Sequence, residues 1–277
     1  MKKLIRSIVS ITLLYGLAAC NGQNKNNMEN ETIIRFETNK GDIKVKLYNK
    51  TPQHRDNMIK LIKDKFYNGT LFHRVINDFM IQGGDPNSKN AHTDKILGEG
   101  DTGYTIPAEF VYPQYFHKKG ALAAARTGDD INPEKASSGC QFYIVTGTVF
   151  TPEELNEMEE NLNRRVVKEK FDSLARPYMK DIYKMRKAND IDSLSALQER
   201  LVAEAEAEAA KTPFRFTPEQ KRAYTTIGGT PHLAGSYTVF GEVIEGLDVV
   251  ENIQKVKTNH NDRPIEDVII KEVTIEN

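Results

Sequence analysis

The sequence predicts a mainly β fold of closed architecture, interrupted by an inserted helical hairpin. Apolar and polar residues alternate over residues 33–47, as is typical of paired strands, and clusters of turn residues separate further short β-rich runs. Such clusters favour a closed all-β architecture with long loops over a layered α/β fold. One stretch, residues 151–224, shows helical spacing instead of strand alternation and forms the predicted insertion.

The β region begins with a hairpin followed by a helix. The runs IIRFET and IKVKLY flank the turn residues 39–42, which predicts two antiparallel strands. Thr51-Pro52 then opens a helix with proline in its first turn, and apolar residues recur at helical spacing until residues 67–69 end it.

The remaining β runs are short and separated by long turns. Turn clusters occupy residues 85–90, 98–103 and 127–139, and each predicts a loop between strands. Residues 238–246 and 267–275 are two more β-rich runs, and a second short helix is predicted between them at 247–253. The chain therefore returns to β structure after the insertion.

The insertion carries two apolar stripes at helical spacing, over residues 155–185 and 191–205. Thr151-Pro152-Glu153-Glu154 is a capping box with proline at the first helical position, and residues 217–220 repeat it. Pro177 is expected to kink or split the first helix, because proline lacks an amide donor and crowds the preceding turn. The acidic and basic blocks of this segment either face one another across the hairpin or form solvated faces.

The N-terminus has the organisation of an export signal. A basic segment, residues 1–6, precedes an apolar stretch, residues 7–19, that is too short to span a bilayer comfortably. The ending LAAC resembles the bacterial lipobox, which implies that residues 1–19 are removed and that Cys20 carries lipid chains. Residues 20–31 form the expected flexible tether. An ordinary cleaved signal with an incidental cysteine is the alternative.

This leader places the protein in the bacterial cell envelope, anchored to a membrane after export, with the choice of membrane left open. With Cys20 lipidated, Cys140 is the only free cysteine expected in the mature chain, so no internal disulfide can form. The formal net charge of −1 argues against nucleic acid as a partner, since phosphate backbones require a clustered basic surface.

Residues 72–85, FHRVINDFMIQGGD, have the composition of a binding site. The run combines a long donor, Arg74, with bulky apolar side chains such as Phe79 and Met80 and with the amide of Gln82. A buried strand needs none of these polar members, and a solvated edge would not carry Phe79 and Met80. Gly83 and Gly84 are interpreted as a tight backbone turn, because the run is too short for a nucleotide loop.

This run resembles the central signature of the cyclophilins, the cyclosporin-binding peptidyl-prolyl isomerases. The resemblance covers residues 32–150 and 225–277, and residues 151–224 interrupt it. It implies a closed eight-stranded antiparallel barrel capped by two helices. The insertion replaces a short loop that precedes residues of the substrate pocket, so it is expected to emerge beside the active site.

The implied activity is isomerisation of X-Pro bonds in unfolded or extended segments of exported proteins. Rotation about the amide has a barrier of about 18 to 20 kcal/mol, so a catalyst must bind the twisted amide better than either planar form. It needs no nucleophile, metal or cofactor. By resemblance, Arg74 directs its guanidinium at the prolyl nitrogen, which regains a lone pair in the twisted state.

The resemblance also implies the rest of the site. Phe79 and Gln82 join Arg74 as catalytic positions, and the other matches are expected to bind the substrate. These matches are Met80, Ala125, Arg126, Gln141, Tyr143, His232, Leu233 and Tyr237. Ala125 and Arg126 lie in the segment whose backbone pairs with the substrate in the family. Tyr143 stands where phenylalanine is usual, so its hydroxyl must reach solvent or a partner.

Two departures from the family pattern concern the rim of the pocket. His232 occupies the position of a tryptophan found in many eukaryotic members, and Tyr237 occupies a histidine position. An imidazole offers less apolar contact than an indole, so cyclosporin binding is expected to be weak. The catalytic arginine is retained, so isomerase activity with an altered ligand preference is expected.

Other chemistries fit the sequence poorly. The histidines show no HExxH or CxxC-type spacing, so no metal is expected, and no Ser-His-Asp set can be identified. A function of another class stays open, namely a membrane-tethered chaperone or binding module in which the pocket and hairpin hold exposed segments and isomerisation is incidental. Arg74 and Gln82 favour the enzyme.

Overall fold

The computed structural model describes residues 31–276 of the 277-residue chain, which lie in one compact unit. The predicted signal peptide, the lipidation site Cys20 and nearly all of the tether fall outside the described residues. The structure therefore concerns the region in which the sequence predicts the β fold and its helical insertion.

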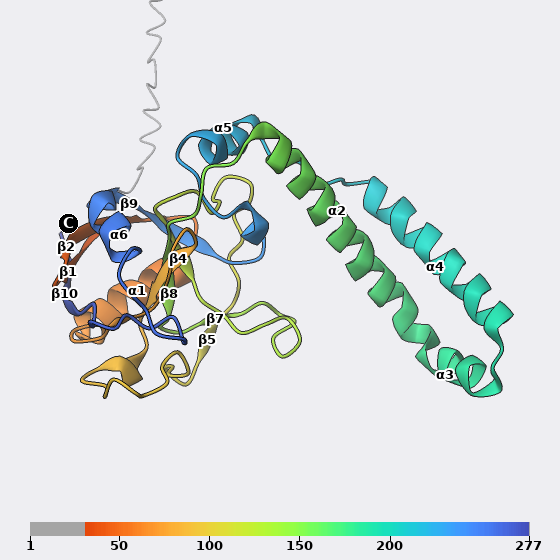
Figure 1. The fold of residues 1–277 in the computed structure, drawn as a ribbon, viewed down its shortest axis with the longest axis horizontal. Helices are drawn as coiled ribbons and strands as arrows, with labels where there is room; N and C mark the ends of the chain where they lie inside the picture. The colour runs from red at the N-terminus through yellow and green to blue at the C-terminus, as the bar shows by residue number, and fades with distance from the viewer. Residues whose placement is uncertain (1–30, 277) are drawn as a thin grey trace, which may run out of the picture. The chain divides into compact units, whose positions relative to one another are not determined.

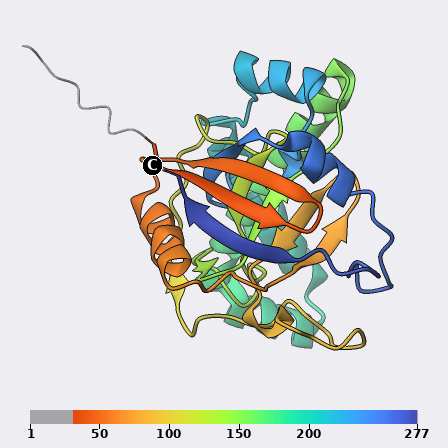
Figure 2. The same cartoon turned by 90° about the vertical axis from the view of Figure 1, so that its left-hand side faces the viewer.

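An eight-stranded antiparallel sheet dominates the fold (Figure 1). Its strands follow the order β10-β1-β2-β9-β6-β8-β4-β3. Their bounds are β1 Ile33–Thr38, β2 Gly41–Leu47, β3 Phe72–Ile76, β4 Met80–Gly83, β6 Ala121–Ala124, β8 Phe142–Val145, β9 Val239–Glu245 and β10 Ile270–Ile275. Two further short strands, β5 Thr105–Ile106 and β7 Ser137–Ser138, pair with each other in the loops. The predicted hairpin over residues 33–47 is confirmed, and Figure 2 shows it beside β10.

The sheet is curled, and its two edges meet through a few bonds instead of a continuous ladder. An isolated bridge joins Leu71 to Ile269, and the Phe72 amide donates to the Val268 carbonyl at 2.9 Å. The prediction of eight antiparallel strands is confirmed. Since these contacts lie only at the start of β3 and just before β10, the curled sheet is a half-barrel and not the closed barrel that the resemblance implied.

The main core lies inside this curl, where the strand alternation places its apolar side chains. Ile34, Phe36, Ile43 and Val45 are completely buried, while the residues between them are more exposed. The two predicted helices, α1 Pro52–Lys63 and α6 Leu247–Ile253, are both present. They add Met58, Leu61, Ile62, Val250 and Ile253 to the same core.

The insertion forms the predicted helical hairpin, followed by a short helix that begins at the second predicted capping box. Its elements are α2 Pro152–Ala175, α3 Met179–Ala188, α4 Ile191–Ala210 and α5 Pro218–Thr226. The capping boxes at Thr151 and Thr217 are both formed, and a 3₁₀ turn over Arg176–Tyr178 splits the first helix at Pro177 as expected. Helices α2 and α4 lie side by side, and α3 joins them at one end (Figure 1).

A separate apolar cluster attaches the hairpin to the rest of the fold. Leu155 and Leu162 of α2 pack with Phe216 and Tyr224, and with Phe116 from the loop before β6. The carboxylate of Glu159, only 5% exposed, accepts from the Phe216 amide at 2.8 Å and from Lys221 Nζ at 3.1 Å. The chain that returns from α4 is thus held against α2 by both apolar packing and a buried carboxylate.

No helix within residues 31–276 combines the length and the apolar character needed to cross a bilayer.

Candidate active site

The register of four strands places the central polar side chains in one row. Arg74 on β3 pairs with Gln82 on β4, Gln82 pairs with Tyr143 on β8, and Tyr143 pairs with Ala123 on β6. Directly paired residues point to the same side of a sheet. Because Ile81, between Met80 and Gln82, lies in the main core, this row lies on the opposite, outer face.

A pocket of about 180 Å³ opens on this face. It is lined by Arg74, Phe79, Met80, Gln82, Ala125, Arg126, Tyr143, Leu233 and Tyr237. Met80 and Tyr143 are buried in an apolar cluster with Ala121, Ala123 and Val145, and partly buried Phe79, Leu233 and Tyr237 pack against that cluster. The result is an apolar cup with an arginine and an amide at its edge.

Gly84 lets the strand that carries Met80 and Gln82 pass close to its neighbour. Its φ of 92° is left-handed, and a Cβ atom there would lie 2.2 Å from the carbonyl oxygen of Cys140. Only glycine can adopt this conformation at so short a separation. The interpretation of Gly83 and Gly84 as a tight backbone turn agrees with this geometry.

Arg74 is held from two sides and keeps part of its guanidinium free. Nη1 donates to Gln82 Oε1 at 3.3 Å, and Nε lies 3.5 Å from Asp262 Oδ2. Its side chain remains 42% exposed. Nη2 has no hydrogen-bond partner among residues 31–276, so the arginine can still donate to a bound molecule.

A chain of amides fixes the orientation of Gln82. The amide nitrogen of Gln141 donates to the carbonyls of Gly98 at 2.8 Å and Gly100 at 2.7 Å. Its oxygen must therefore face Gln82, whose amide nitrogen donates to it at 2.9 Å. Gln82 in turn presents its oxygen to Arg74. Gln141 does not line the 180 Å³ pocket, but it sets the direction of the hydrogen bond that holds the guanidinium.

The side chain of Arg126 is held by neighbouring groups, whereas its backbone amide and carbonyl are available to a ligand. Its guanidinium lies 4.4 Å from the ring centroid of Tyr237, donates to the Ser236 carbonyl at 2.9 Å, and pairs with Asp129 at 2.6 Å. In the described part of the chain no group bonds to its backbone amide or carbonyl, so both remain for a bound peptide. The amide and carbonyl of Ala125, in contrast, are already paired with Gln141 and Ser138.

Tyr143 has a buried partner for its hydroxyl. His117 Nε2 lies 3.0 Å from Tyr143 Oη, and the two rings are stacked. Burial raises the pKa of Tyr143 well above its usual range and lowers the pKa of His117 to about 3. Both groups are therefore neutral at pH 7, and the hydroxyl is satisfied without reaching solvent.

His232 supports the pocket without lining it. Its ring packs against Phe79, with the centroids 5.5 Å apart, and burial lowers its pKa, with a smaller effect from Arg165 of α2. Helix α2 therefore runs close to the rim of the pocket, as expected for an insertion beside the site. All other predicted site residues that the resemblance named, except Gln141, lie in the pocket itself.

Two residues that complete the site were not expected from the sequence. Asp262 sits in a loop almost two hundred residues after Arg74, with no local pattern to mark it. The sequence does hold a signal for His117. A tyrosine in a phenylalanine position needs a partner for its hydroxyl, and a histidine just before β6 can supply one. Among residues 31–276, no group of three His, Cys, Asp or Glu side chains is placed to hold a metal ion.

Comparison with known proteins identifies this arrangement. The family described as "Cyclophilin type peptidyl-prolyl cis-trans isomerase/CLD" matches residues 33–168 and 203–275. The chain belongs to the cyclophilin family. It is a peptidyl-prolyl cis-trans isomerase, as the resemblance of residues 72–85 predicted. Residues 169–202 are not part of either matched segment, so the family match of this cyclophilin is interrupted in the outer part of the hairpin.

Relatives of similar length share most of the chain. A protein of Staphylococcus haemolyticus with the name "Putative peptidyl-prolyl cis-trans isomerase" is 29% identical over 255 residues, which cover 91% of this chain and 96% of the relative. One of Staphylococcus saprophyticus is 30% identical over 248 residues, 89% and 92% of the two chains. The crystal structure of a Cryptosporidium parvum cyclophilin superposes with a TM-score of 0.52 at 19% identity and covers 89% of this chain and 98% of its own. This likeness supports the cyclophilin-like fold.

Proposed function

We propose that this cyclophilin isomerises X-Pro bonds by non-covalent stabilisation of the twisted amide, with Arg74 as the key donor. The observation that carries the proposal is the position of Arg74 at the edge of the apolar pocket, held by Gln82 and still able to donate. The proline ring would occupy the cup formed by Phe79, Met80 and Leu233. The guanidinium would then face the prolyl nitrogen.

The physical argument depends on what changes during rotation. In the planar amide the nitrogen lone pair is delocalised, so the nitrogen is a poor acceptor. In the twisted amide the lone pair is localised, and a donor that is already in place stabilises this state without stabilising the ground states equally. The amide chain from Gln141 through Gln82 supports the mechanism, because it fixes Arg74 before the substrate binds.

The test is the rate of isomerisation of a proline tetrapeptide by the wild type and by Arg74→Ala. Loss of one preorganised donor costs about 2.7 to 4 kcal/mol, so kcat/KM is expected to fall about a hundred- to a thousandfold. Arg35→Ala is a matched control, because Arg35 also pairs with an aspartate but lies on β1, away from the pocket. An unchanged rate in a folded Arg74→Ala variant would refute the mechanism.

The proposed substrates are proline-containing segments of unfolded or extended exported proteins. The free backbone of Arg126 beside the cup supports an extended chain, since both its amide and its carbonyl can pair with a bound strand. A Cryptosporidium parvum cyclophilin was crystallised in the presence of the dipeptide Ala-Pro, and it superposes on this chain with a TM-score of 0.51. This supports a prolyl peptide as the proposed ligand.

The proposed location is the bacterial cell envelope, with Cys20 as the lipid attachment site. Support comes from the basic N-terminal segment, the short apolar stretch and LAAC. Cys20→Ser is expected to move the protein from membrane to soluble fractions or to block its processing, since anchoring depends on the acyl chains. Mature wild-type protein whose intact mass includes no lipid would contradict the assignment.

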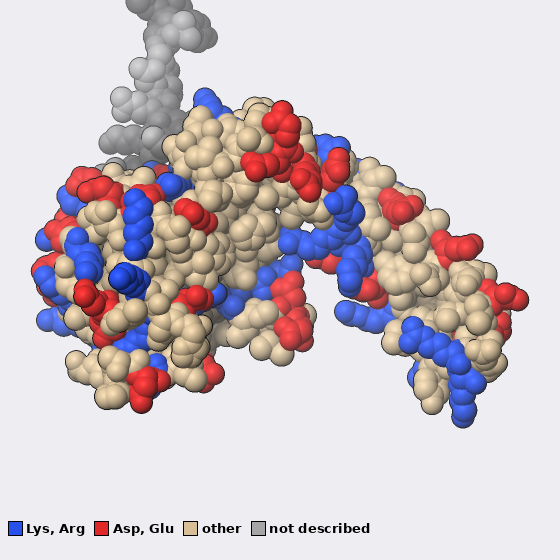
Figure 3. Space-filling view, viewed as in Figure 1, with Lys and Arg blue, Asp and Glu red and all other residues tan. Residues whose placement is uncertain are grey.

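A second candidate function is client binding by the hairpin. Met179 and Tyr183 lie one turn apart on α3 and are largely exposed, Tyr183 at 68%, and Ile191 is exposed at the start of α4. Helix α3 also carries Lys180, Lys184 and Lys187, and Figure 3 shows Lys and Arg side chains at this end of the hairpin. This combination suits extended client segments with apolar and acidic side chains, whose local concentration near the pocket would rise.

A further inference from the structure

Arg74 separates the proline pocket from a second pocket. This second pocket has a volume of about 250 Å³, and it is lined by residues from β3, from residues 94–97 and from residues 259–263. Of the residues that the structure describes, Arg74 alone lines both pockets. A peptide chain that binds its proline in the first pocket and crosses the guanidinium therefore reaches the second.

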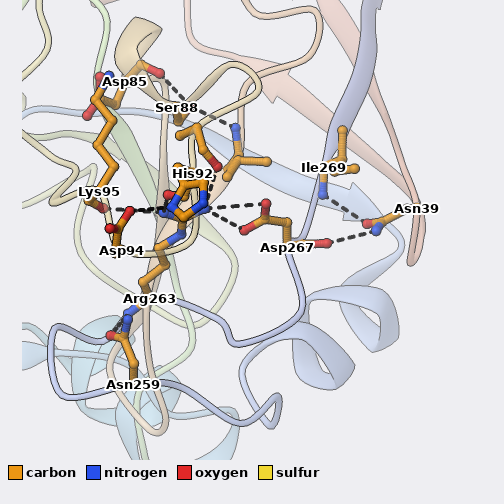
Figure 4. A network of polar contacts seen from close by, with 12 residues as sticks. Asn39, Asp85, Ser88, His92, Asp94, Lys95, Asn259, Arg263, Asp267 and Ile269 are labelled. Carbon is orange, nitrogen blue, oxygen red and sulfur yellow. Dashed lines mark hydrogen bonds and ion pairs between the residues drawn. The ribbon is translucent and has the colours of Figure 1, made fainter.

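The walls of the second pocket are held in place before any ligand binds. Arg263, whose side chain is 4% exposed, donates to the carbonyls of Ala91, His92 and Lys95 and pairs with Asp267 at 3.0 Å (Figure 4). These bonds join the loop before β5 to the loop before β10. The Val75 amide also donates to the Asp262 carbonyl at 2.8 Å, which ties the second loop to β3.

A buried imidazole lacks a partner in this pocket. His73 is 2% exposed, and neither of its ring nitrogens has a hydrogen-bond partner of normal geometry among residues 31–276, although the Leu71 backbone and the Asp85 carboxylate lie near the ring. Burial lowers the pKa of His73 to about 4, so at pH 7 the ring is neutral and carries one N–H donor. Buried polar groups are normally paired, so this imidazole has a donor available for a group that enters the pocket.

The polar groups around His73 are mostly donors. Lys95, His260 and Asn261 line the pocket and are exposed, and Arg74 keeps Nη2 free. Lys95 uses one of its three donors on the Asn87 carbonyl. The single carboxylate among the lining residues, Asp94, is already paired with His92, and the carboxylate of Asp262 pairs with Arg74. The buried carboxylate of Asp85 also acts on His73, but it already accepts from the Asn87 and Gly98 amides. The remaining polar groups are donors, and the positive charges of Lys95 and Arg74 favour an anionic group.

We propose that this second pocket is a subsite for an acidic side chain, Asp or Glu, close in sequence to the proline that occupies the first pocket. The subsite deepens the proposed function and rests on it. It selects substrates by a charge beside the X-Pro bond and takes no part in the rotation itself. Lys95 and His260 are specificity residues for this side chain, and His73 is its buried donor.

The test uses the full chain and proline peptides in which one Glu is moved through the three positions on each side of X-Pro, each matched by a Gln peptide. At one position, kcat/KM is expected to be about fivefold higher for Glu than for Gln, the upper range for an exposed ion pair. The double variant Lys95→Met/His260→Gln should reduce this ratio to about one. Lys271→Met, an exposed lysine on β10, is the control and should keep it.

The outcomes separate this proposal from the isomerase mechanism. If every peptide is turned over with equal rates for Glu and Gln, the subsite is wrong while the isomerase remains. If a Glu preference persists in the double variant, the acidic side chain binds elsewhere, and the subsite is again wrong. If Arg74→Ala leaves turnover of the Gln peptides unchanged, the mechanism fails, and the bridging role of Arg74 fails with it.

Discussion

The hydroxyl of Tyr143 and the imidazole of His117 lie 3.0 Å apart beneath the proline pocket. A tyrosine in a position where cyclophilins usually carry phenylalanine has a buried hydroxyl that needs a hydrogen-bond partner, and His117 supplies it. His117 Nδ1 has no partner among the described residues, so Tyr143 is the only group that satisfies this buried ring within residues 31–276. The two residues therefore depend on each other.

Removal of the Tyr143 hydroxyl is expected to destabilise the protein. In Tyr143→Phe neither nitrogen of His117 has a partner, and an unsatisfied buried group costs about 1 to 3 kcal/mol. Urea unfolding should show this loss in the free energy of unfolding. The double variant Tyr143→Phe/His117→Phe should recover much of it, because both polar partners are then absent. Equal stability of the wild type and Tyr143→Phe would show that the pair contributes nothing.

Stability is expected to fall as the pH falls below about 6.5, the ordinary pKa of histidine. Burial lowers the pKa of His73 to about 4 and that of His117 to about 3, so the unfolded chain binds protons that the folded chain excludes. The stabilisation is complete above the unfolded pKa and is lost as the pH falls toward the folded values. For His73 alone the loss between pH 7 and pH 4 is about 3 kcal/mol.

The same double variant isolates the contribution of His117 to this pH dependence. Carboxylates also titrate over this pH range. The contribution of His117 is therefore measured as the difference in pH dependence between the variant and the wild type. The slope of unfolding free energy against pH should be smaller in Tyr143→Phe/His117→Phe than in the wild type. Ile131→Ser, which alters an exposed side chain that does not titrate, should leave the slope as it is. Identical slopes in all three proteins would contradict the prediction.

Cyclosporin is expected to inhibit this enzyme weakly, and His232→Trp should strengthen inhibition. His232 supports Phe79 from outside the pocket, and an indole in its place would add apolar contact area at the rim while keeping one N–H donor. Inhibition constants and tetrapeptide turnover should be measured on both proteins. The substitution should change inhibition more than turnover, and tight inhibition of the wild type would refute the role assigned to this rim position.

Shortening the hairpin tests client binding. Residues 169–202 lie outside the family match, whereas Leu155, Leu162 and Tyr224 pack against Phe116 and should be kept. Replacement of residues 169–202 by a short Gly-Ser linker is expected to leave tetrapeptide turnover nearly intact and to slow proline-limited refolding of a protein substrate. The double variant Met179→Ser/Tyr183→Ser in the full chain should also slow refolding of the protein substrate, but by less than the deletion does. Equal refolding by all three proteins would leave the hairpin without a client role.

Local sequence determined much of the fold. Alternation over residues 33–47 predicted the first hairpin, and proline with capping residues predicted the starts of α1, α2 and α5, because these signals involve residues that are close together in the chain. Pro177 predicted the break between α2 and α3 for the same reason. Residues 72–85 also identified the pocket, since Arg74, Phe79, Met80 and Gln82 come from a single strand pair and its turn.

Tertiary structure decided the contacts between segments that are distant in the sequence. Asp262 reaches Arg74, and Glu159 holds the chain at Phe216, through backbone paths that no local pattern describes. The pairing of Tyr143 with His117, the position of His232 behind Phe79, and the second pocket beside Arg74 arise in the same way. The sequence gives the chemistry of each side chain. The partner of each buried or charged group depends on how the sheet curls and on which hydrogen bonds connect its loops.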